Sequence, residues 1–395
     1  MAEAFCLCLL FCPLPRRAGH LLDRAACGLE SSSVTTTDQL RTRRVADVRR
    51  LLSPQALRDS LPLAADLEDV VLQGRDAVAA VLNREDDRLL VVVGPCSIHD
   101  PAAALEYARR LREVARRLDE QLLVVMRVYF EKPRTTLGWK GLINDPGLDE
   151  SFRIEDGLRA ARTLLLEILS FDLPVGCEFL DPISPQYIDD TVSWGAIGAR
   201  TSQSQVHRQV ASGLSMPIGF KNSTEGDVRG AVDGVSVAAG AHVFAGIAAH
   251  GSAAVIATTG NPDCHVVLRG GRTGPNYDEA SVAETLSLLE SSGQMRRVVI
   301  DASHDNSGKD HRRQSLVVEE IAARTARGER EIVGLMLESF LVPGRQDLVF
   351  GQSAALSYGQ SITDACIGWE ETVTMLELLA DAVQKRNAPI SAREP

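Results

Sequence analysis

The chain has 395 residues, of which 45% are hydrophobic, and its formal net charge at pH 7 is −11. This length and apolar content allow a sizeable core, built either as one large α/β domain or as two smaller domains. The acidic balance argues against binding of nucleic acid or anionic membranes, because both need a basic surface. No apolar run reaches the roughly 18 residues of a membrane-spanning helix, so we expect no membrane partner.

The N-terminal stretch AFCLCLLFCPLP is apolar, but the basic pair RR follows it instead of preceding it. A secretory signal has the opposite charge order and a small-residue cleavage site. We therefore expect residues 1–35 to be a disordered extension or a mis-assigned start. Helix-like sequence begins with DQLRTRRVADVRRLLSP, residues 38–54.

The eight cysteines show no pairing rhythm, and four of them are scattered through the main body of the chain, at positions 96, 177, 264 and 366. A disulfide-stabilised secreted domain would carry regularly spaced cysteines. We therefore expect a reducing compartment and a cytoplasmic protein.

Eight short β-rich apolar runs recur along the chain, and amphipathic helical stretches separate many of them. Alternating β and α units predict a parallel sheet, and eight of them favour a closed (β/α)8 barrel. A doubly wound sheet is the alternative, but its Gly-rich GxGxxG turn is missing from this sequence. Residues 242–260 predict an extra β-hairpin between barrel strands 5 and 6. The eight runs are RLLVVVGPCS, LLVVMRVYF, PVGCEFLD, WGAIGAR, PIGFKN, HVVLRGG, RRVVIDASH and EIVGLMLESF.

Each predicted strand carries a polar or reactive residue at its C-terminal end, which is the active-site face of such barrels. Six of these residues are cations, and Thr135 and Thr136 add hydroxyl donors. A cluster of cations predicts substrates with several negative charges, although pairing with surface carboxylates is the alternative for any single cation. The six cations are Arg127, Lys132, Arg134, Arg200, Lys221 and Arg269.

A second candidate constellation combines a thiol, an imidazole and two carboxylates: Cys96, His304, Glu338 and Asp364. Such a set can hold a divalent transition ion with open positions for a substrate oxygen. No local motif links the four residues, so spacing alone leaves this open. A nucleophilic role for Cys96 is the competing interpretation.

Long blocks of the sequence resemble the class I 3-deoxy-D-arabino-heptulosonate 7-phosphate (DAHP) synthases, in particular the larger microbial subtype. The resemblance covers about residues 40 to 390. It implies a (β/α)8 barrel that condenses phosphoenolpyruvate with erythrose 4-phosphate and releases phosphate, at the start of the shikimate pathway to aromatic amino acids. The blocks are GPCSIHDP, MRVYFEKPRTT, GWKGLINDP, GCEFLD, SWGAIGARTSQSQVHR, GFKN, LRGG, DASH and SITDACIGWE.

The resemblance also implies roles for individual residues. Lys132, Cys96 and His304 are expected to be catalytic. Phosphoenolpyruvate is expected to bind Arg127, Lys132, Glu178, Arg200, Lys221 and Arg269. Erythrose 4-phosphate is expected to bind Lys132, Pro133, Arg134 and Thr135. One divalent ion per subunit (Mn, Fe, Co or Zn) is expected on Cys96, His304, Glu338 and Asp364.

Members of this family are often inhibited by an aromatic amino acid at a separate pocket. Pro185, Gln186 and Ser215 lie in segments that resemble it, so we expect an allosteric site there in a homodimer or homotetramer. We expect residues 36–75 to form a regulatory and assembly segment and residues 76–395 to form the catalytic barrel. The chain departs from the family pattern at NST, residues 222–224, and at RTGPN, residues 272–276.

Three other functions remain open on the sequence. A related enzyme could join phosphoenolpyruvate to another aldose phosphate, such as arabinose 5-phosphate, but those relatives are shorter and lack the KPRTTLGWKG and SITDACIGWE blocks. A catalytically silent paralogue acting as a partner subunit is the second alternative. A barrel that binds phosphorylated sugars without turnover is the third.

Overall fold

The computed structural model describes residues 43–134 and 138–388. In this part of the chain, eight parallel strands form a closed barrel in the order β1-β10-β9-β8-β5-β4-β3-β2. Each strand coincides with one of the eight predicted runs, so the predicted (β/α)8 barrel is confirmed. The strands are β1 (Leu89–Gly94), β2 (Leu122–Arg127), β3 (Val175–Glu178), β4 (Trp194–Ile197), β5 (Ile218–Lys221), β8 (His265–Leu268), β9 (Val298–Asp301) and β10 (Ile332–Glu338).

The barrel strands are buried on both faces, which is why they are continuous apolar runs and not alternating ones. Strand β1 shows the two faces. Val91 and Val93 pack in the cluster that includes residues of the surrounding helices. Leu90 and Val92 belong to a smaller cluster that also holds Trp194 of β4. Side chains of successive residues in a strand point to opposite faces, so the smaller cluster fills the barrel interior.

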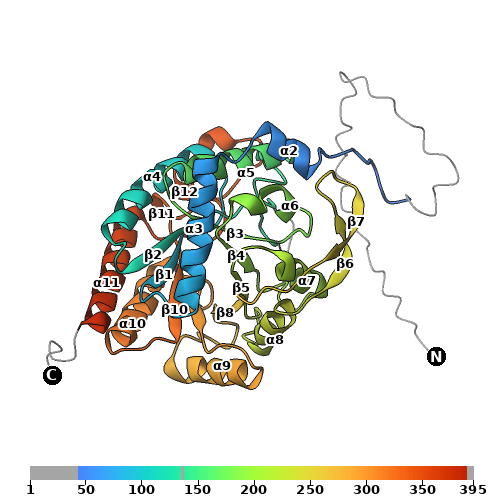
Figure 1. Ribbon diagram of the computed structural model, residues 1–395. Coiled ribbons are helices and arrows are strands. Elements are labelled where there is room, and N and C mark those ends of the chain that lie inside the picture. Colours follow the sequence, from blue (N-terminus) through green and yellow to red (C-terminus); the bar gives the residue numbers. More distant parts are fainter. Residues whose placement is uncertain (1–42, 135–137, 389–395) are drawn as a thin grey trace, which may run out of the picture. The chain divides into compact units, whose positions relative to one another are not determined.

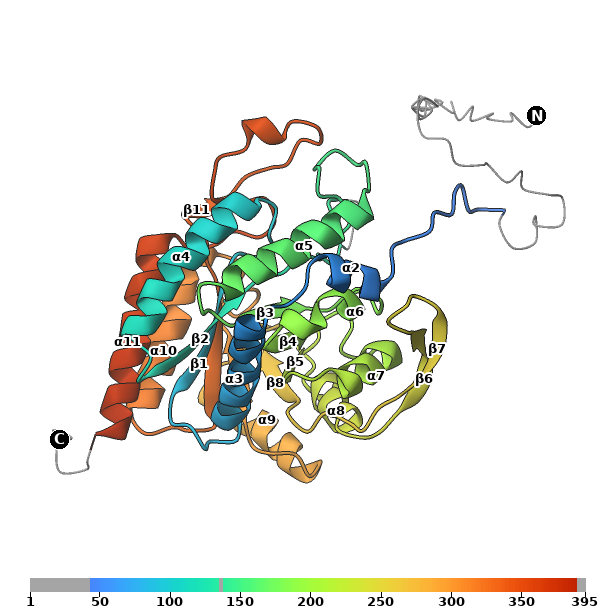
Figure 2. The same cartoon turned by 45° about the horizontal axis from the view of Figure 1, so that its top comes forward.

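Helices surround the barrel strands (Figures 1 and 2). Helix α4 shows how a local signal starts such a helix: the Asp100 carboxylate accepts hydrogen bonds from the backbone N–H groups of Ala102 and Ala103. Within the described ranges, no helix is long and apolar enough to cross a membrane. The helices around the strands are α4 (Pro101–Arg117), α5 (Ile154–Leu169), α6 (Pro185–Ile188), α7 (Gln205–Gly213), α8 (Arg229–Ala238), α9 (Glu279–Ser291), α10 (Gln314–Ala326) and α11 (Trp369–Asn387).

Helix α3 (Ala65–Leu82) precedes the first barrel strand and crosses in front of the strands in Figure 1. Its residues Val78, Val81 and Leu82 pack in the interior cluster, so this helix contributes to the barrel core. The helix continues through residue 75, where we expected the regulatory and assembly segment to end and the catalytic barrel to begin. This boundary stays a prediction.

The predicted extra hairpin is confirmed as the antiparallel pair β6 (Val243–Ile247) and β7 (Ala253–Ala257), between barrel strands β5 and β8. It lies beside α7 in both views (Figures 1 and 2). The remaining short elements are η2 (Asp189–Thr191), η3 (His311–Arg313), η4 (Ser353–Ala355), β11 (Val342–Arg345) and β12 (Gln360–Ser361).

The helical character expected for residues 38–54 is wrong for the described part of that segment. Residues 45–53 contain no helix, and α2 (Pro54–Ser60) starts only at Pro54, where the Ser53 side chain accepts a hydrogen bond from Ala56 N–H. Residues 45–51 are all exposed, including Val45 and Val48 at 49% and 81%, so this stretch has no buried face. Most helical stability in proteins comes from packing such a face. The chain divides into two compact units after Arg50.

Candidate active site

The predicted strand-end residues meet at one cavity of about 670 Å³. Nine Lys or Arg residues and only four Asp or Glu residues line it, so the cavity is cationic although the chain as a whole is acidic. Cys96 does not line this cavity but lies fully buried next to it, 2.9 Å from Lys132 Nζ. Thr135 lies outside the described residues. The predicted site residues that line the cavity are Arg127, Lys132, Pro133, Arg134, Glu178, Arg200, Lys221, Arg269, His304, Glu338 and Asp364.

Three of the six predicted cations, Arg127, Lys221 and Arg269, are paired with carboxylates at the barrel mouth. Arg127 Nη2 donates to Glu338 Oε1 at 2.8 Å, with both side chains almost fully buried. Lys221 Nζ lies 3.2 Å from Asp301 Oδ2 and 4.0 Å from Glu178 Oε1. Separating such a pair would leave a buried charge without its partner, which costs free energy. Each pair therefore holds its cation in position.

Arg269 has the third pairing, with 2.5 Å between its Nη1 and Asp305 Oδ2. Its Nε is buried and makes no hydrogen bond within the described residues. A guanidinium has five N–H donors, so the pairing with Asp305 leaves donor capacity for an anionic ligand.

Three buried asparagines connect the loops that carry these groups. The Asn222 side-chain oxygen, directly after Lys221, accepts from Arg269 N–H at 2.8 Å. Asn276 joins the loop through a 2.7 Å bond from Gly270 N–H to its Oδ1. Asn306 Oδ1 accepts from Asn276 N–H at 2.8 Å. The network holds the loops after β5, β8 and β9 in one arrangement.

Gly270 in the LRGG block is required by this close packing. Its φ is +74°, and a Cβ there would lie 2.6 Å from Asn306 N. A larger residue would push the loops apart, so we interpret the glycine as a packing requirement of the site.

The donor atoms of three of the four predicted metal ligands gather at one side of the cavity, and His304 lies beside this group. Ligand atoms of Cys96, Glu338 and Asp364 lie within 4.8 Å of one another. The His304 Nε2 atom lies 3.8 Å from Glu338 Oε1. His304 adopts a left-handed backbone conformation with a φ of +54°. For a non-glycine residue this costs free energy, and such strain is concentrated at functional sites.

The surroundings of these donors suit a divalent ion. The other ring nitrogen of His304, Nδ1, lies 2.8 Å from Ser303 Oγ and 2.9 Å from Asp301 Oδ2. Metal-binding histidines usually have such a partner, which orients the ring. Burial and the charge of Glu338 raise the pKa of the Cys96 thiol to about 12, which makes a free thiolate unfavourable. A bound dication would reverse this and deprotonate the thiol.

The segment that follows β2 folds back on itself next to the cavity. Lys132 N–H donates to Lys140 O at 2.9 Å, which closes the loop carrying Lys132, Pro133 and Arg134. Gly141 has a φ of +113°, and a Cβ there would lie 2.0 Å from Phe130 O, so only glycine fits. The loop brings two cations to the mouth of the barrel.

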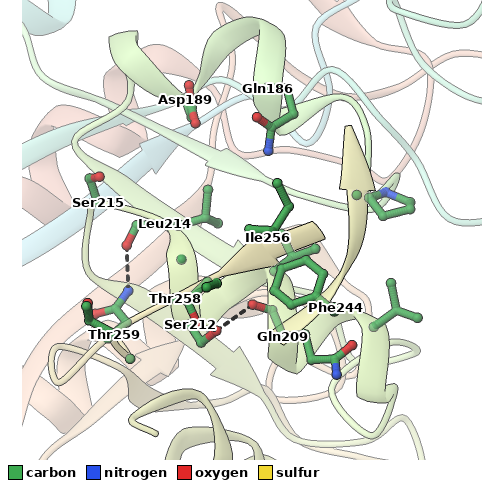
Figure 3. Close-up of a pocket in the computed structure, with 18 of the residues that line it drawn as sticks. Gln186, Asp189, Gln209, Ser212, Leu214, Ser215, Phe244, Ile256, Thr258 and Thr259 are labelled. Atoms are coloured by element: carbon green, nitrogen blue, oxygen red, sulfur yellow. Dashed lines mark hydrogen bonds between the residues drawn. The ribbon is translucent and has the colours of Figure 1, made fainter. Parts of the chain in front are cut away.

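A second cavity of about 1010 Å³ lies away from the barrel mouth. Its lining includes Gln186 and Ser215, two of the three residues predicted for an effector pocket. Pro185 directly precedes Gln186 in α6 but is not one of the lining residues. Figure 3 shows Phe244 and Ile256 of the hairpin and Gln186 of α6 on the walls of this cavity.

Sequence reasoning missed Asp301 and Asp305, which pair with Lys221 and Arg269. Asp301 stands in the quoted DASH block, so its charge at a strand end was a signal that could have identified it. Asp305 and Lys309 lie in the loop after β9, Arg272 lies in the loop after β8, and Arg345 ends the short strand β11, so the further lining charges follow no recognisable pattern.

Comparisons with known proteins agree with this geometry. Residues 66–377 match the family model of the DAHP synthetase I family. A phospho-2-dehydro-3-deoxyheptonate aldolase of Corynebacterium glutamicum is 52% identical over 351 residues, which cover 88% of this chain and 95% of that protein. The Phe-sensitive enzyme of that name from Escherichia coli K12 is 51% identical over 343 residues, covering 87% and 97%.

A solved structure of phospho-2-dehydro-3-deoxyheptonate aldolase from Francisella tularensis shares the fold, with a TM-score of 0.85 and 48% sequence identity. The match covers 87% of this chain and all of that one. The barrel, the cationic cavity and these matches lead to the same conclusion: the chain belongs to the DAHP synthetase I family.

Proposed function

We propose that this chain is a DAHP synthase, which condenses phosphoenolpyruvate with erythrose 4-phosphate to give DAHP and phosphate. The observation that supports this best is the cavity at the strand ends, which nine cations and four carboxylates line, and where two of those carboxylates, Glu338 and Asp364, group with the Cys96 thiol. Both substrates are phosphorylated, and phosphoenolpyruvate also carries a carboxylate, so their charges complement this excess of cations.

The phosphoenolpyruvate subsite consists of the residues in and around the barrel mouth. Arg127 and Lys221 are anchored by buried carboxylates, and Arg269 retains an unused Nε donor. Fixed donors of this kind can hold a phosphate and a carboxylate without reorganising during the reaction. We assign Arg127, Lys132, Glu178, Arg200, Lys221 and Arg269 to this subsite.

The erythrose 4-phosphate subsite lies on the loop after β2. Pro133 and Arg134 line the cavity next to Lys132, and Lys132 Nζ lies between this loop and Cys96. We assign Lys132, Pro133, Arg134 and Thr135 to this substrate. Lys132 would then contact both substrates and hold them together.

Cys96, His304, Glu338 and Asp364 would hold one divalent ion, and we leave open whether it is Mn, Fe, Co or Zn. Such an ion supplies Lewis-acid polarisation of a carbonyl oxygen. The protein residues contribute position: the cations place C3 of phosphoenolpyruvate against the aldehyde carbon of the sugar phosphate, where the new C–C bond forms. Water adds at C2, near Glu178, and the hemiketal phosphate then loses phosphate.

The decisive experiment follows the loss of phosphoenolpyruvate absorbance with erythrose 4-phosphate present. We expect consumption to need both substrates, to stop with a chelator and to return with a divalent metal. Consumption with arabinose 5-phosphate but not erythrose 4-phosphate would show that the substrate assignment is wrong. No consumption with any aldose phosphate would favour a silent paralogue or a binding protein.

We further propose that the second cavity binds an aromatic amino acid as a feedback inhibitor, because a relative with 51% identity is named Phe-sensitive. The apolar side chains of Phe244 and Ile256 suit an aromatic ring, and Gln186 and Ser215 offer polar partners. Phe, Tyr and Trp should be compared as inhibitors of the wild type and of Ser215→Phe, which places a bulky side chain in the cavity. Equal inhibition of both proteins would place the inhibitor elsewhere.

We place the enzyme in the cytoplasm as a homodimer or homotetramer. The four cysteines of the described residues are free and buried, which suits a reducing compartment. Analytical ultracentrifugation would determine the assembly, and a monomer at micromolar concentration would contradict it.

A further inference from the structure

Tyr129 lies two residues beyond the end of β2 and is fully buried. It does not line the substrate cavity but belongs to the interior cluster of the barrel, with Trp194 and Met336. Its hydroxyl lies 4.0 Å from the Met336 sulfur, which is a weak acceptor. The ring therefore occupies the top of the apolar interior, where that interior meets the charged mouth.

The ring is close to two of the cations assigned to phosphoenolpyruvate. The guanidinium carbon Cζ of Arg127 lies 3.6 Å from the Tyr129 ring centroid, which is stacking distance. The Lys221 Nζ atom lies 5.7 Å from the same centroid. Both distances fall within the roughly 6 Å over which an aromatic face attracts a cation. Both cations are almost fully buried, at 1% and 2% exposure, so this attraction is weakly screened.

A neutral aromatic ring solves a specific problem at this position. Arg127 and Lys221 have each lost most of their hydration, and both already have buried carboxylate partners: Glu338 for Arg127, and Asp301 and Glu178 for Lys221. A further carboxylate beneath them would neutralise the positive charge that an anionic substrate needs. An aliphatic residue would offer no attraction. The ring face attracts both cations and leaves their net charge unchanged.

We propose that Tyr129 is a positioning residue for phosphoenolpyruvate, acting through Arg127 and Lys221. Its ring fixes the plane of the guanidinium and the place of the ammonium before the substrate arrives, so binding does not require either side chain to be ordered. This inference rests on the proposed function, because it takes those two cations to be substrate ligands.

The test compares Tyr129→Phe, which keeps the ring, with Tyr129→Leu, which removes it. We expect Tyr129→Leu to raise the Kd of phosphoenolpyruvate, measured by calorimetry without the second substrate, by about tenfold, in line with a buried cation–π contact. The KM for phosphoenolpyruvate should rise in parallel, and the KM for erythrose 4-phosphate should stay within twofold. Tyr129→Phe should restore wild-type affinity to within twofold.

Tyr107→Leu is the matched control, because Tyr107 is also fully buried but contacts Trp369 and Phe340 instead of a cation. It should lose comparable stability in thermal unfolding and retain phosphoenolpyruvate affinity. The proposal is wrong if Tyr129→Leu binds phosphoenolpyruvate as tightly as wild type. It is equally wrong if Tyr129→Phe is as weak as Tyr129→Leu, or if Tyr107→Leu weakens binding as much.

A series of variants that conserve the shape of the ring tests the proposal even if Tyr129→Leu does not fold. Starting from Tyr129→Phe, residue 129 is replaced by phenylalanine analogues with increasing numbers of ring fluorines. The fluorines progressively reduce the negative electrostatic potential on the face of the ring. We expect the Kd of phosphoenolpyruvate to rise with each fluorine, and a constant Kd would overturn the proposal. A wild-type protein that neither binds nor consumes phosphoenolpyruvate would instead contradict the proposed function itself.

Discussion

Cys96 shows how the chemistry of one residue depends on its neighbours. In sequence it is one of eight cysteines, and it could be a nucleophile, a ligand or a buried thiol. Its Sγ lies 3.4 Å from Asp364 Oδ2 and 2.9 Å from Lys132 Nζ, and its ligand atom groups with those of two carboxylates. Burial and the charge of Glu338 disfavour a free thiolate nucleophile more than Lys132 favours it, so the surroundings favour the ligand role.

Cys96→Ala should therefore lose metal affinity and activity, each by at least about 100-fold. Metal content after dialysis, measured by mass spectrometry, and the phosphoenolpyruvate assay provide the two readouts. Cys177→Ala is the control, because Cys177 is equally buried but donates to Val128 O and belongs to no donor cluster. Equal metal content in both variants would exclude Cys96 as a ligand.

Glu131 provides a pH-dependent prediction. It is 6% exposed, and burial raises its pKa from 4.5 to about 7, although Ser184 Oγ donates to it at 2.8 Å. Because the pKa is raised in the folded state, the contribution of Glu131 to stability is greatest below about pH 4.5 and falls as the pH rises towards 7. The neutral isostere Glu131→Gln does not lose stability in this way as the pH rises, because glutamine does not ionise.

Relative to wild type, Glu131→Gln should gain stability between about pH 5 and pH 8, by an amount on the order of 3 kcal/mol. Urea unfolding at several pH values measures this difference. A difference that does not change with pH would mean that Glu131 has an ordinary pKa.

At the scale of elements, the segment α6–η2 is held by arginine side chains of two other helices. Arg162 of α5 donates to both carboxylate oxygens of Asp190 at 2.6 and 2.8 Å, and to Tyr187 O at 3.1 Å. Arg58 of α2 donates to Gln186 O at 2.7 Å. These contacts fix the wall of the second cavity on which Gln186 lies.

Arg162→Gln should destabilise the protein by about 3 kcal/mol, because it leaves a carboxylate and a backbone carbonyl without their buried partner. Arg159→Gln on the same helix is the control. Its Glu155 partner is on the surface, and such pairs contribute about 1 kcal/mol or less. Urea unfolding midpoints measure the stability of both variants. Equal losses of stability would show that the buried Arg162–Asp190 pair contributes no more than the surface pair.

The elements themselves were largely predictable. All eight barrel strands were found because strands buried on both faces appear as continuous apolar runs. The helix expected in residues 38–54 was wrong for the described residues, since Val45 and Val48 have a helix-like spacing but are exposed and so give no packing free energy. Local pattern predicts an element only where tertiary packing supports it.

At the scale of the whole molecule, a cationic cavity lies in a chain whose net charge is −11. The acidic surface repels anions in general, and the local field of the cavity attracts them. Both effects are screened by salt, because the Debye length shortens from about 10 Å at 0.1 M.

We expect kcat/KM for phosphoenolpyruvate to fall several-fold as NaCl rises from about 0.05 to about 0.5 M. The kcat at saturating substrate should change by less than twofold. Initial rates at constant free metal test this, and a kcat/KM that is independent of salt would show that the cavity field does not contribute to substrate capture.

The sequence by itself determined the class of fold, the number of barrel strands, the position of the extra hairpin and, through its resemblance to a family, most of the groups at the strand ends. These follow from local apolar periodicity and from the rule that parallel strands present their carboxyl ends on one face. Only the tertiary structure decided which charges are paired. Asp301 lies against Lys221 and Asp305 lies against Arg269, because the ends of different barrel strands meet at the mouth. Such contacts depend on distances between residues far apart in the chain, which no local pattern specifies.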